Sequence, residues 1–323
     1  MRRKVMAIGA VTLSFWVVLS LAEDDKGWAQ YPTKPITCIV SFEAGGPTDI
    51  SARIICDPAS KILGQPIVVT NKAGGTGSVA LASLKKEKPD GYTICTIAGG
   101  VFISQHMREL PFDLTRDFTP IIQYGDYSLP VLVRAESPWK TFKELVDFAK
   151  ANPGKIRYGT SGTGSIYHLA MEHLALQEGI KWIHIPFKGC HPANMALLGG
   201  HIEVMVCPAD FKPFVQSGQL RLLSTFGQTR SPSFPDVPTW KELGYNISVI
   251  HMAAFVGPKG LPKSVVEKLH GAFKQAMDDP EFKRVMKDLE MPIYYRNSED
   301  LAKQFKELTS FYGQLVKQIG LKE

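Results

Sequence analysis

From residue 36 onward, short apolar runs alternate with segments in which apolar residues recur every three or four positions. The first apolar run is Ile36 to Val40, and the helical segment after it places Ile50 and Ile54 on one face. Short apolar runs bounded by glycine or proline predict strands, and the longer period predicts helices. Pro58 falls inside the first predicted helix, and because an interior proline costs about 3 kcal/mol, we expect a kink or a restart with Asp57 as the cap. The alternation as a whole predicts an α/β fold with largely parallel sheets.

The length of the chain, 323 residues, exceeds the usual size of a single hydrophobic core, so we expect two lobes. Residues 119–134 hold two apolar runs around Gly125 and Asp126, which is long for one strand. We expect this segment to pass from one lobe to the other. The first lobe is expected to comprise residues 31–130 together with 250–323, and the second lobe residues 131–249.

Residues 1–22 have the pattern of an export signal peptide rather than of a folded segment. Basic residues 2–4 precede an apolar run, and residues 20–22, Ser-Leu-Ala, have the small side chains of a cleavage site. Cleavage as late as residue 29 stays open. An uncleaved membrane anchor also stays open, because the apolar run of 17 residues approaches the length of about 20 that a span needs. A cleaved signal predicts that the mature chain is exported.

Charge and cysteine content exclude several classes of site. The formal net charge of +6 is mild, and basic residues alternate with acidic ones, so no patch indicates nucleic acid as a partner. The cysteines are odd in number and have no C-x-x-C spacing, so neither a zinc site nor a thioredoxin-type pair is predicted. One disulfide is compatible with an oxidising compartment, but the sequence leaves its pairing open. We expect no metal and no cofactor. The cysteines are Cys38, Cys56, Cys95, Cys190 and Cys207.

The first candidate site is a strand that stops at two glycines and continues as a helix. This segment, Phe42-Glu43-Ala44-Gly45-Gly46-Pro47-Thr48-Asp49, is called the first corner below. The first N–H groups of a helix have no helical acceptor and lie at the positive end of the helix dipole, so they bind small anions. Asp49 either caps its own helix or accepts a hydrogen bond from a ligand hydroxyl or water. The alternative for the segment is an ordinary tight turn.

A second segment of the same kind is Gly159-Thr160-Ser161-Gly162-Thr163-Gly164-Ser165, called the second corner below. It lies between an expected strand and the expected helix 165–178, and it combines three glycines, four hydroxyls and a helix N-terminus. His168, one turn into that helix, either faces the site or packs in the core. Lys188 either pairs with the distal end of a diacid or is a solvated side chain. Two such corners favour a binding site for an anion, although a solvent-facing glycine loop remains the alternative.

Three sharper interpretations of the second corner fit less well. A phosphate loop needs lysine where Ser165 stands. A nucleophile elbow needs glycine where Thr163 stands. His168 and His173 are five residues apart, about 140° round a helix, so they do not form a zinc-binding pair. An exported serine hydrolase that uses Ser161 or Ser165 with His168 is retained as an alternative function, and a sensory adaptor for a membrane kinase is another.

The motifs resemble one family along nearly all of the chain after the signal. The sequence is similar to those of the tripartite tricarboxylate transporter substrate-binding proteins, also called the Bug family. The matching motifs occur in order and at compatible spacing, which is more specific than any single motif. They are Tyr31-Pro32-x-Lys34-Pro35-Ile36, Phe42-x-Ala44-Gly45-Gly46-x-x-Asp49, Ala52-Arg53, Leu63-Gly64-Gln65, Asn71 with Gly74-Gly75-x-Gly77, Pro89-Asp90-Gly91-Tyr92-Thr93, Ser161-Gly162-x-Gly164-Ser165 with His168-Leu169, Pro186-Phe187-Lys188-Gly189, Pro192-Ala193, Leu197-Leu198-Gly199-Gly200, Ser217-Gly218, Pro235-Asp236-Val237-Pro238-Thr239 and Pro258-x-Gly260-x-Pro262.

The resemblance implies a two-lobed periplasmic binding protein of the Venus flytrap kind, type II-like, with a parallel or mixed sheet in each lobe and two crossing strands. It implies a receptor, not an enzyme, which captures an organic carboxylate between the two corners, often with ordered waters. The ligand is expected to be a di- or tricarboxylate or an aromatic acid. The closed receptor, expected as a monomer, would present it to two integral membrane subunits of a transporter driven by an ion gradient.

The sequence departs from the family pattern at a few positions. Ala196 stands where the family often has aspartate, Met252 stands near a common tryptophan, and residues 207–211 do not align without a gap. With His251, His191 and Asp210, Met252 is a candidate to shape an individual pocket, so the identity of the carboxylate stays open. The candidate ligand-binding residues are Phe42, Ala44, Gly45, Gly46, Thr48, Asp49, Thr160, Ser161, Gly162, Thr163, Gly164, Ser165, His168 and Lys188.

Overall fold

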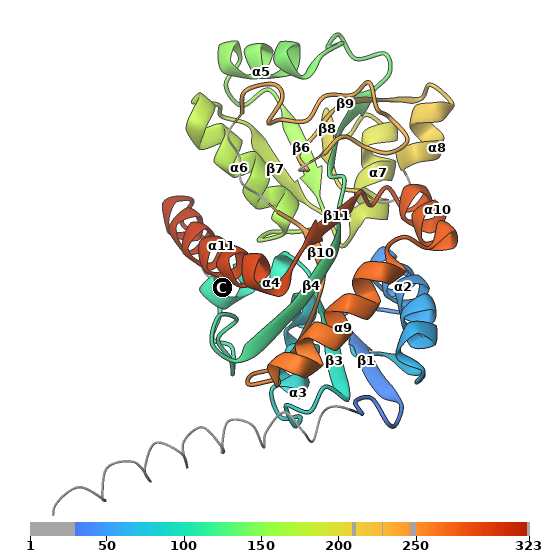
Figure 1. Ribbon diagram of the computed structural model, residues 1–323. Coiled ribbons are helices and arrows are strands. Elements are labelled where there is room, and N and C mark those ends of the chain that lie inside the picture. The colour runs from blue at the N-terminus through green and yellow to red at the C-terminus, as the bar shows by residue number, and fades with distance from the viewer. Residues whose placement is uncertain (1–29, 209–210, 228, 246–249, 322–323) are drawn as a thin grey trace, which may run out of the picture.

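The computed structural model describes residues 30–208, 211–227, 229–245 and 250–321. These residues form two α/β lobes, one above the other in Figure 1, and each lobe is built on one mixed sheet. Lobe 1 denotes the six-stranded sheet with its helices, and lobe 2 denotes the five-stranded sheet with its helices. The predicted two-lobed α/β fold is therefore confirmed. The expectation of largely parallel sheets is wrong, because β10 (Met252–Pro258) and β5 (Pro130–Arg134) run antiparallel to both of their neighbours and β11 (Ile293–Arg296) runs antiparallel to β4 (Phe118–Asp126).

The sheet of lobe 1 has the strand order β11-β4-β10-β3-β1-β2. Its strands are β1 (Ile36–Val40), β2 (Ile67–Asn71), β3 (Thr93–Ile97), β4 (Phe118–Asp126), β10 (Met252–Pro258) and β11 (Ile293–Arg296). Its helices are α2 (Pro47–Leu63), the short 3₁₀ helix η1 (Gly75–Gly77), α3 (Ser78–Leu84), α4 (Gly100–Met107), α9 (Lys263–Ala276), α10 (Pro280–Asp288) and α11 (Ser298–Gln318).

The sheet of lobe 2 has the strand order β7-β6-β8-β5-β9. Its strands are β5 (Pro130–Arg134), β6 (Arg157–Thr160), β7 (Ile183–Pro186), β8 (Val204–Val206) and β9 (Leu220–Thr225). Its helices are α5 (Phe142–Ala151), α6 (Ile166–Glu178), α7 (Cys190–Leu198) and α8 (Phe211–Gln216).

The chain passes between the lobes in the segment that the two apolar runs predicted. Strand β4 ends at Asp126 in the sheet of lobe 1, and β5 begins at Pro130 in the sheet of lobe 2. The chain is back in lobe 1 at β10, which pairs antiparallel with both β3 and β4. The residue limits expected for the two lobes stay a prediction.

Parallel pairing brings the loops of each lobe to one edge of its sheet. In lobe 1, β1 runs parallel to β2 and β3, and the backbone N–H of Ser41 after β1 donates to Thr96 Oγ1 on β3 at 2.9 Å. In lobe 2, β6 runs parallel to β7 and β8, and Phe187 N after β7 donates to Thr160 O at the end of β6 at 3.0 Å. In open α/β sheets, ligands bind at the carboxyl ends of such strands.

Stacked aromatic side chains pack in the core of each lobe. In lobe 1, Tyr124 of β4 stacks on Phe255 of β10 with ring centroids 5.0 Å apart. In lobe 2, Phe142 of α5 stacks on Trp240 at 5.2 Å. All four side chains are buried, and one continuous apolar core contains them together with Tyr127 between the lobes. Each stacked pair contributes about 0.5–1.5 kcal/mol beyond its buried area.

Helix α2 corrects one expectation. It runs from Pro47 to Leu63 with Pro58 inside it, so the predicted restart at Asp57 is wrong. The Asp57 carboxylate pairs with Lys61 one turn later, at 2.7 Å, instead of capping a new helix. Ile55 and Ala59 are fully buried on either side of the proline, so burial of this face offsets the backbone hydrogen bond that proline removes.

Candidate ligand-binding site

The first corner places an open helix N-terminus at the carboxyl edge of the lobe 1 sheet. Helix α2 begins at Pro47, and its N-cap, Gly46, has no side-chain capping bond. Gly45 has a φ of +82°, a left-handed conformation that glycine adopts without strain. Ala44 and Gly45 are exposed, and Gly46 is half-buried. The first turn of α2 therefore has no side-chain cap at Gly46 that would compete with an anion, and the loop before it is open to solvent.

Asp49 braces the first corner from inside the protein. Its carboxylate accepts hydrogen bonds from Gly45 N at 2.9 Å, from Arg53 Nε at 2.9 Å and from Asn71 Nδ2 at 2.8 Å. Its exposed fraction is 3%. Burial by itself raises the pKa of the Asp49 carboxyl, but the bonds from Arg53, Gly45 and Asn71 together lower that pKa below its ordinary value. Asp49 is thus a positioning residue that fixes the Gly45 turn, and the Arg53 guanidinium balances its charge.

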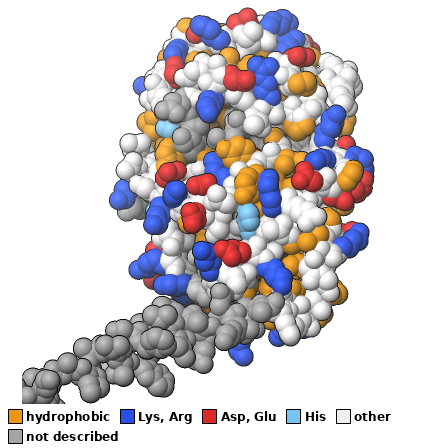
Figure 2. Space-filling model, viewed as in Figure 1, with side chains coloured by type: hydrophobic (Ala, Val, Ile, Leu, Met, Phe, Trp, Pro, Cys, Tyr) orange, Lys and Arg blue, Asp and Glu red, His pale blue; other side chains and the backbone are white. Residues whose placement is uncertain are grey.

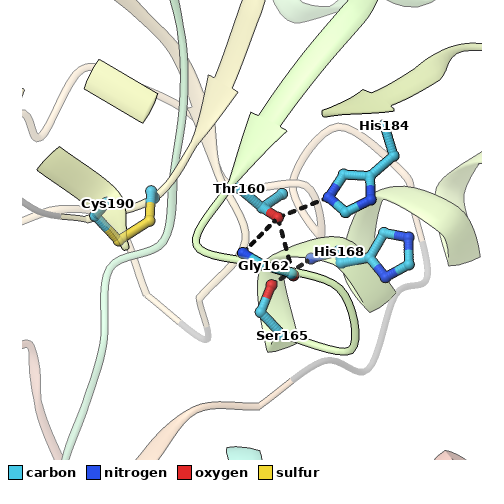
Figure 3. The surroundings of a disulfide bond; sticks show 7 residues. Thr160, Gly162, Ser165, His168, His184 and Cys190 are labelled. Atoms are coloured by element: carbon cyan, nitrogen blue, oxygen red, sulfur yellow. Dashed lines mark hydrogen bonds between the residues drawn. A yellow bond between two sulfur atoms is a disulfide. The ribbon is translucent and has the colours of Figure 1, made fainter. Parts of the chain in front are cut away.

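The second corner has the same construction in lobe 2 (Figure 3). Strand β6 ends at Thr160, and the hydroxyl of Ser165 caps α6 by accepting from His168 N at 3.3 Å. The buried hydroxyl of Thr160 lies 3.1 Å from Gly162 O, 3.3 Å from Gly162 N and 2.8 Å from His184 Nε2. Thr160 therefore holds the turn in shape. Thr163 is exposed, and the remaining loop residues from 161 to 165 are half-buried.

The imidazole of His168 lies beneath the second corner. Its Nδ1 accepts a hydrogen bond from Gly164 N at 3.1 Å, and its ring stacks on His184 with centroids 3.9 Å apart. Only 6% of the residue is exposed. Burial, and to a smaller extent His184, lowers the pKa of His168 to about 3, and burial lowers the pKa of His184 to about 4. Both rings are neutral near pH 7 and support the loop. Ser165 Oγ caps the helix by accepting from the His168 backbone, and the His168 ring uses its Nδ1 to accept from Gly164 N.

Each corner faces an element of the opposite lobe. A cavity of about 450 Å³ adjoins the first corner at Gly45 and Pro47, and its lobe 2 wall includes Pro208, Phe211 and Lys212. The second corner lies against the end of α4, because a Cβ on Gly164 would lie 2.6 Å from the Met107 thioether.

Aromatic residues connect the two helix N-termini between the lobes. Residues 127–129 link β4 to β5 and are called the crossing segment below. Thr48 Oγ1 on α2 lies 2.6 Å from the hydroxyl of Tyr127 in this segment. Tyr127 packs on His251 with ring centroids 4.2 Å apart, and His251 meets Tyr167 of α6 edge-on at 6.4 Å. Burial lowers the pKa of His251 to about 4, so this ring is neutral near pH 7. Sequence reasoning missed Tyr127 and Tyr167, because only the fold brings the crossing segment and α6 together.

The remaining candidates take different places. Lys188 is exposed beside the second corner, and His191 is exposed at the start of α7. Met252 is fully buried in β10. Asp210 lies outside the described residues.

Cys190 and Cys207 form a disulfide next to the second corner, which settles the pairing that the sequence left open (Figure 3). Cys190 opens α7 after β7, and Cys207 directly follows β8, so the bond links two loops at the carboxyl edge of the lobe 2 sheet. The other three cysteines are free and buried in lobe 1.

Within the described residues, no group of three or more His, Cys, Asp or Glu side chains is placed to hold a metal ion. No helix in the described ranges is long and apolar enough to span a membrane. Basic and acidic side chains are interspersed on the face shown in Figure 2. The two corners described above offer backbone N–H groups and hydroxyls to a small anion.

Comparison with known proteins identifies the family. A model described as "Tripartite tricarboxylate transporter family receptor" matches residues 51–321. The chain belongs to this receptor family. A relative in Cupriavidus necator, the UPF0065 protein in the gbd 5′ region, is 39% identical over 319 residues, covering 99% of this receptor and 96% of the relative. The resemblance inferred from the sequence motifs is confirmed.

Solved structures agree with this assignment. A TctC solute-binding protein from Polaromonas, solved without ligand, matches the receptor with a TM-score of 0.81 at 31% identity, covering 89% of the receptor and 99% of that chain. MatC from Rhodopseudomonas palustris, solved with bound malate, matches with a TM-score of 0.70 at 27% identity, covering 88% and 100%. The family is one of solute-binding receptors and not of enzymes.

Proposed function

We propose that this receptor captures an organic carboxylate, either a di- or tricarboxylate or an aromatic acid, between its two corners in the periplasm. The receptor, as a monomer, then delivers the carboxylate to the integral membrane subunits of a tripartite transporter. The observation that carries the proposal is that two helix N-termini, one at Pro47 in lobe 1 and one at Ile166 in lobe 2, each face the opposite lobe. The malate bound to the related MatC supports a carboxylate as the ligand.

Both corners are needed on energetic grounds. A micromolar receptor requires about −8 kcal/mol of binding free energy. One helix N-terminus gives an anion only about 0.3–2 kcal/mol, and charge-assisted hydrogen bonds add about 1.5–3 kcal/mol each. A corner that supplies a single charge-assisted bond therefore falls short, so we infer that the two lobes close on the ligand by a hinge motion at the crossing segment.

A thermal-shift screen against a panel of carboxylates, followed by isothermal titration, tests the proposal. We expect at least one carboxylate to raise the melting temperature and to bind with one-to-one stoichiometry. Ser165→Ala should weaken that binding and leave the protein folded. Saturable hydrolysis of simple esters that is lost in Ser161→Ala, with no ligand-induced stabilisation, would instead favour the serine hydrolase.

Export and delivery need separate measurements. N-terminal sequencing of the protein from the periplasmic fraction should show cleavage after residue 22 or as late as residue 29. Uptake of the identified carboxylate should require the membrane subunits together with the receptor. A transcriptional response to the carboxylate that persists without those subunits would favour the sensory adaptor.

A further inference from the structure

The cavity beside the first corner contains a lysine that the sequence analysis did not single out. Its walls are formed by Gly45, Pro47 and Ile50 of lobe 1, by Pro208, Phe211, Lys212 and Pro213 of lobe 2, and by Asp288, Leu289 and Glu290 at the end of α10 and just beyond it. Figure 1 shows α8 and α10 next to each other where this cavity lies. Among the lining residues that the structure describes, Lys212 on α8 carries the one positive charge, and Asp288 and Glu290 carry negative charges. The Asp288 carboxylate pairs with Arg284 at 2.8 Å.

Lys212 is held in place by a buried acid. Its Nζ lies 3.2 Å from Glu290 Oε1, and the exposed fractions of the two side chains are 27% and 6%. The other carboxylate oxygen, Oε2, accepts a hydrogen bond from the Ser231 hydroxyl and one from Ser233 N at 3.4 Å. Glu290 is thus fixed by lobe 2 donors. An ammonium group has three donors, so Lys212 can bond to a second anion while it stays paired with Glu290.

We propose that Lys212 binds the distal carboxylate of the ligand and makes the receptor selective for dicarboxylates over monocarboxylates of equal length. The inference rests on the proposed function, because the first carboxylate must occupy a corner. Gly45 and Lys212 line the same cavity, and no residue of the second corner lines it. An acid whose first carboxylate is bound at the first corner therefore shares this cavity with the Lys212 ammonium. Lys188 does not line the cavity and is exposed to solvent.

Titration with two matched pairs of acids tests the inference. Malate is compared with 2-hydroxybutanoate, and adipate with hexanoate, so that each pair differs by one carboxylate. The wild-type receptor should bind at least one diacid tighter than its partner monoacid. Lys212→Met should weaken binding of the diacid by about tenfold or more, as expected for one charge-assisted bond, and should leave binding of the monoacid unchanged. Lys181→Met is the control, because Lys181 lies before the start of β7, at the end of the strand away from the second corner. It should change the binding of neither the diacid nor the monoacid.

Removing Lys212 alone leaves Glu290 buried without its cation, which is destabilising. The variant Lys212→Met with Glu290→Gln removes both charges and separates selectivity from folding. It should retain the fold and monoacid binding and lose the preference for the diacid, whereas Lys212→Arg should keep part of that preference.

The other outcomes count against the inference. A diacid preference that survives in the double variant, or that is lost in Lys188→Met instead, overturns the role of Lys212. Equal affinity of the wild-type protein for both acids of every pair also overturns it and leaves the proposed function intact. If no carboxylate in a wider panel binds the wild-type protein, the proposed function fails, and the role of Lys212 fails with it.

Discussion

Gly164 of lobe 2 lies directly against Met107 of lobe 1. A Cβ built on Gly164 would be 2.6 Å from both the Sδ and the Cε atoms of Met107. Gly164 belongs to the second corner, and Met107 is the last residue of α4. The position therefore has no room for a side chain unless Met107 moves or the lobes separate.

Gly164→Ala should weaken carboxylate binding by hindering this approach of the lobes. Gly179→Ala is a matched control, because Gly179 has a φ of +68° close to the +72° of Gly164 and has nothing within 4 Å of an added Cβ. Both substitutions should cost about 1–2 kcal/mol of stability from backbone strain. Only Gly164→Ala should reduce affinity, which isothermal titration with the strongest ligand of the panel measures.

A double-mutant cycle with Met107→Ala separates the contact from the strain. If the contact limits closure, Met107→Ala should restore part of the affinity lost in Gly164→Ala, with a coupling energy of about 0.5–1 kcal/mol. Additive effects of the two substitutions would show that Gly164 acts only through its own backbone.

The two corners were predictable because their signals are local. At the first corner, a strand, two glycines and Pro47 lie within a dozen residues, and Ser165 caps the second helix within its own turn. Met107 and Lys212 had no such signal. They meet the corners only across the lobes, and a contact of that kind depends on how the sheets are connected.

The difference between local and non-local signals also explains why the sequence left the disulfide pairing open and predicted a restart as one outcome at Pro58. Cys190 and Cys207 come together because β7 and β8 flank β6, an order that adjacent residues do not specify. Pro58 predicted a kink or a restart, and the restart is wrong because the sequence shows the local cost of proline but not the burial of Ile55 and Ala59.

Asp49→Asn should destabilise the protein by about 1–3 kcal/mol, because one amide cannot accept all three hydrogen bonds that the carboxylate accepts. It should also weaken ligand binding, since the Gly45 turn loses its brace. Asp57→Asn on the same helix is the control. Its carboxylate is 67% exposed and pairs only with Lys61 among the described contacts, so its loss should cost less than about 1 kcal/mol. Equal stability losses in urea denaturation would contradict the bracing role.

The disulfide should contribute both stability and affinity. Cys190 and Cys207 are separated by 17 residues, and closing a loop of this size is worth about 3 kcal/mol in the chain-entropy model. The paired variant Cys190→Ser and Cys207→Ser should lose about that much stability in urea denaturation. It should also bind ligand more weakly, because the loops beside the second corner are no longer tied. Dithiothreitol should lower the stability of the wild-type protein and leave the variant unchanged; a variant that matches the oxidised wild type would rule out this contribution.

The buried imidazoles beneath the second corner should make the receptor sensitive to acid. The ordinary pKa of histidine is about 6.5, and the pKa values of His168 and His184 are lowered to about 3 and about 4. Below pH 6.5 the unfolded chain therefore binds protons that the folded protein does not. The contribution of these two histidines to the stability is fully present above pH 6.5 and decreases as the pH falls toward their folded-state pKa values.

His168→Phe tests this pH dependence with the ring stack retained. Each such histidine contributes a slope of about 1.4 kcal/mol per pH unit in the region between its two pKa values. Urea denaturation between pH 7.5 and 5 should give a shallower loss of stability in His168→Phe than in the wild-type protein, whatever the stability at pH 7.5. His201→Phe, at an exposed position, is the control for the replacement of a histidine by phenylalanine. An unaltered slope in His168→Phe would mean that His168 titrates alike in both states, against its burial between Gly164 and His184.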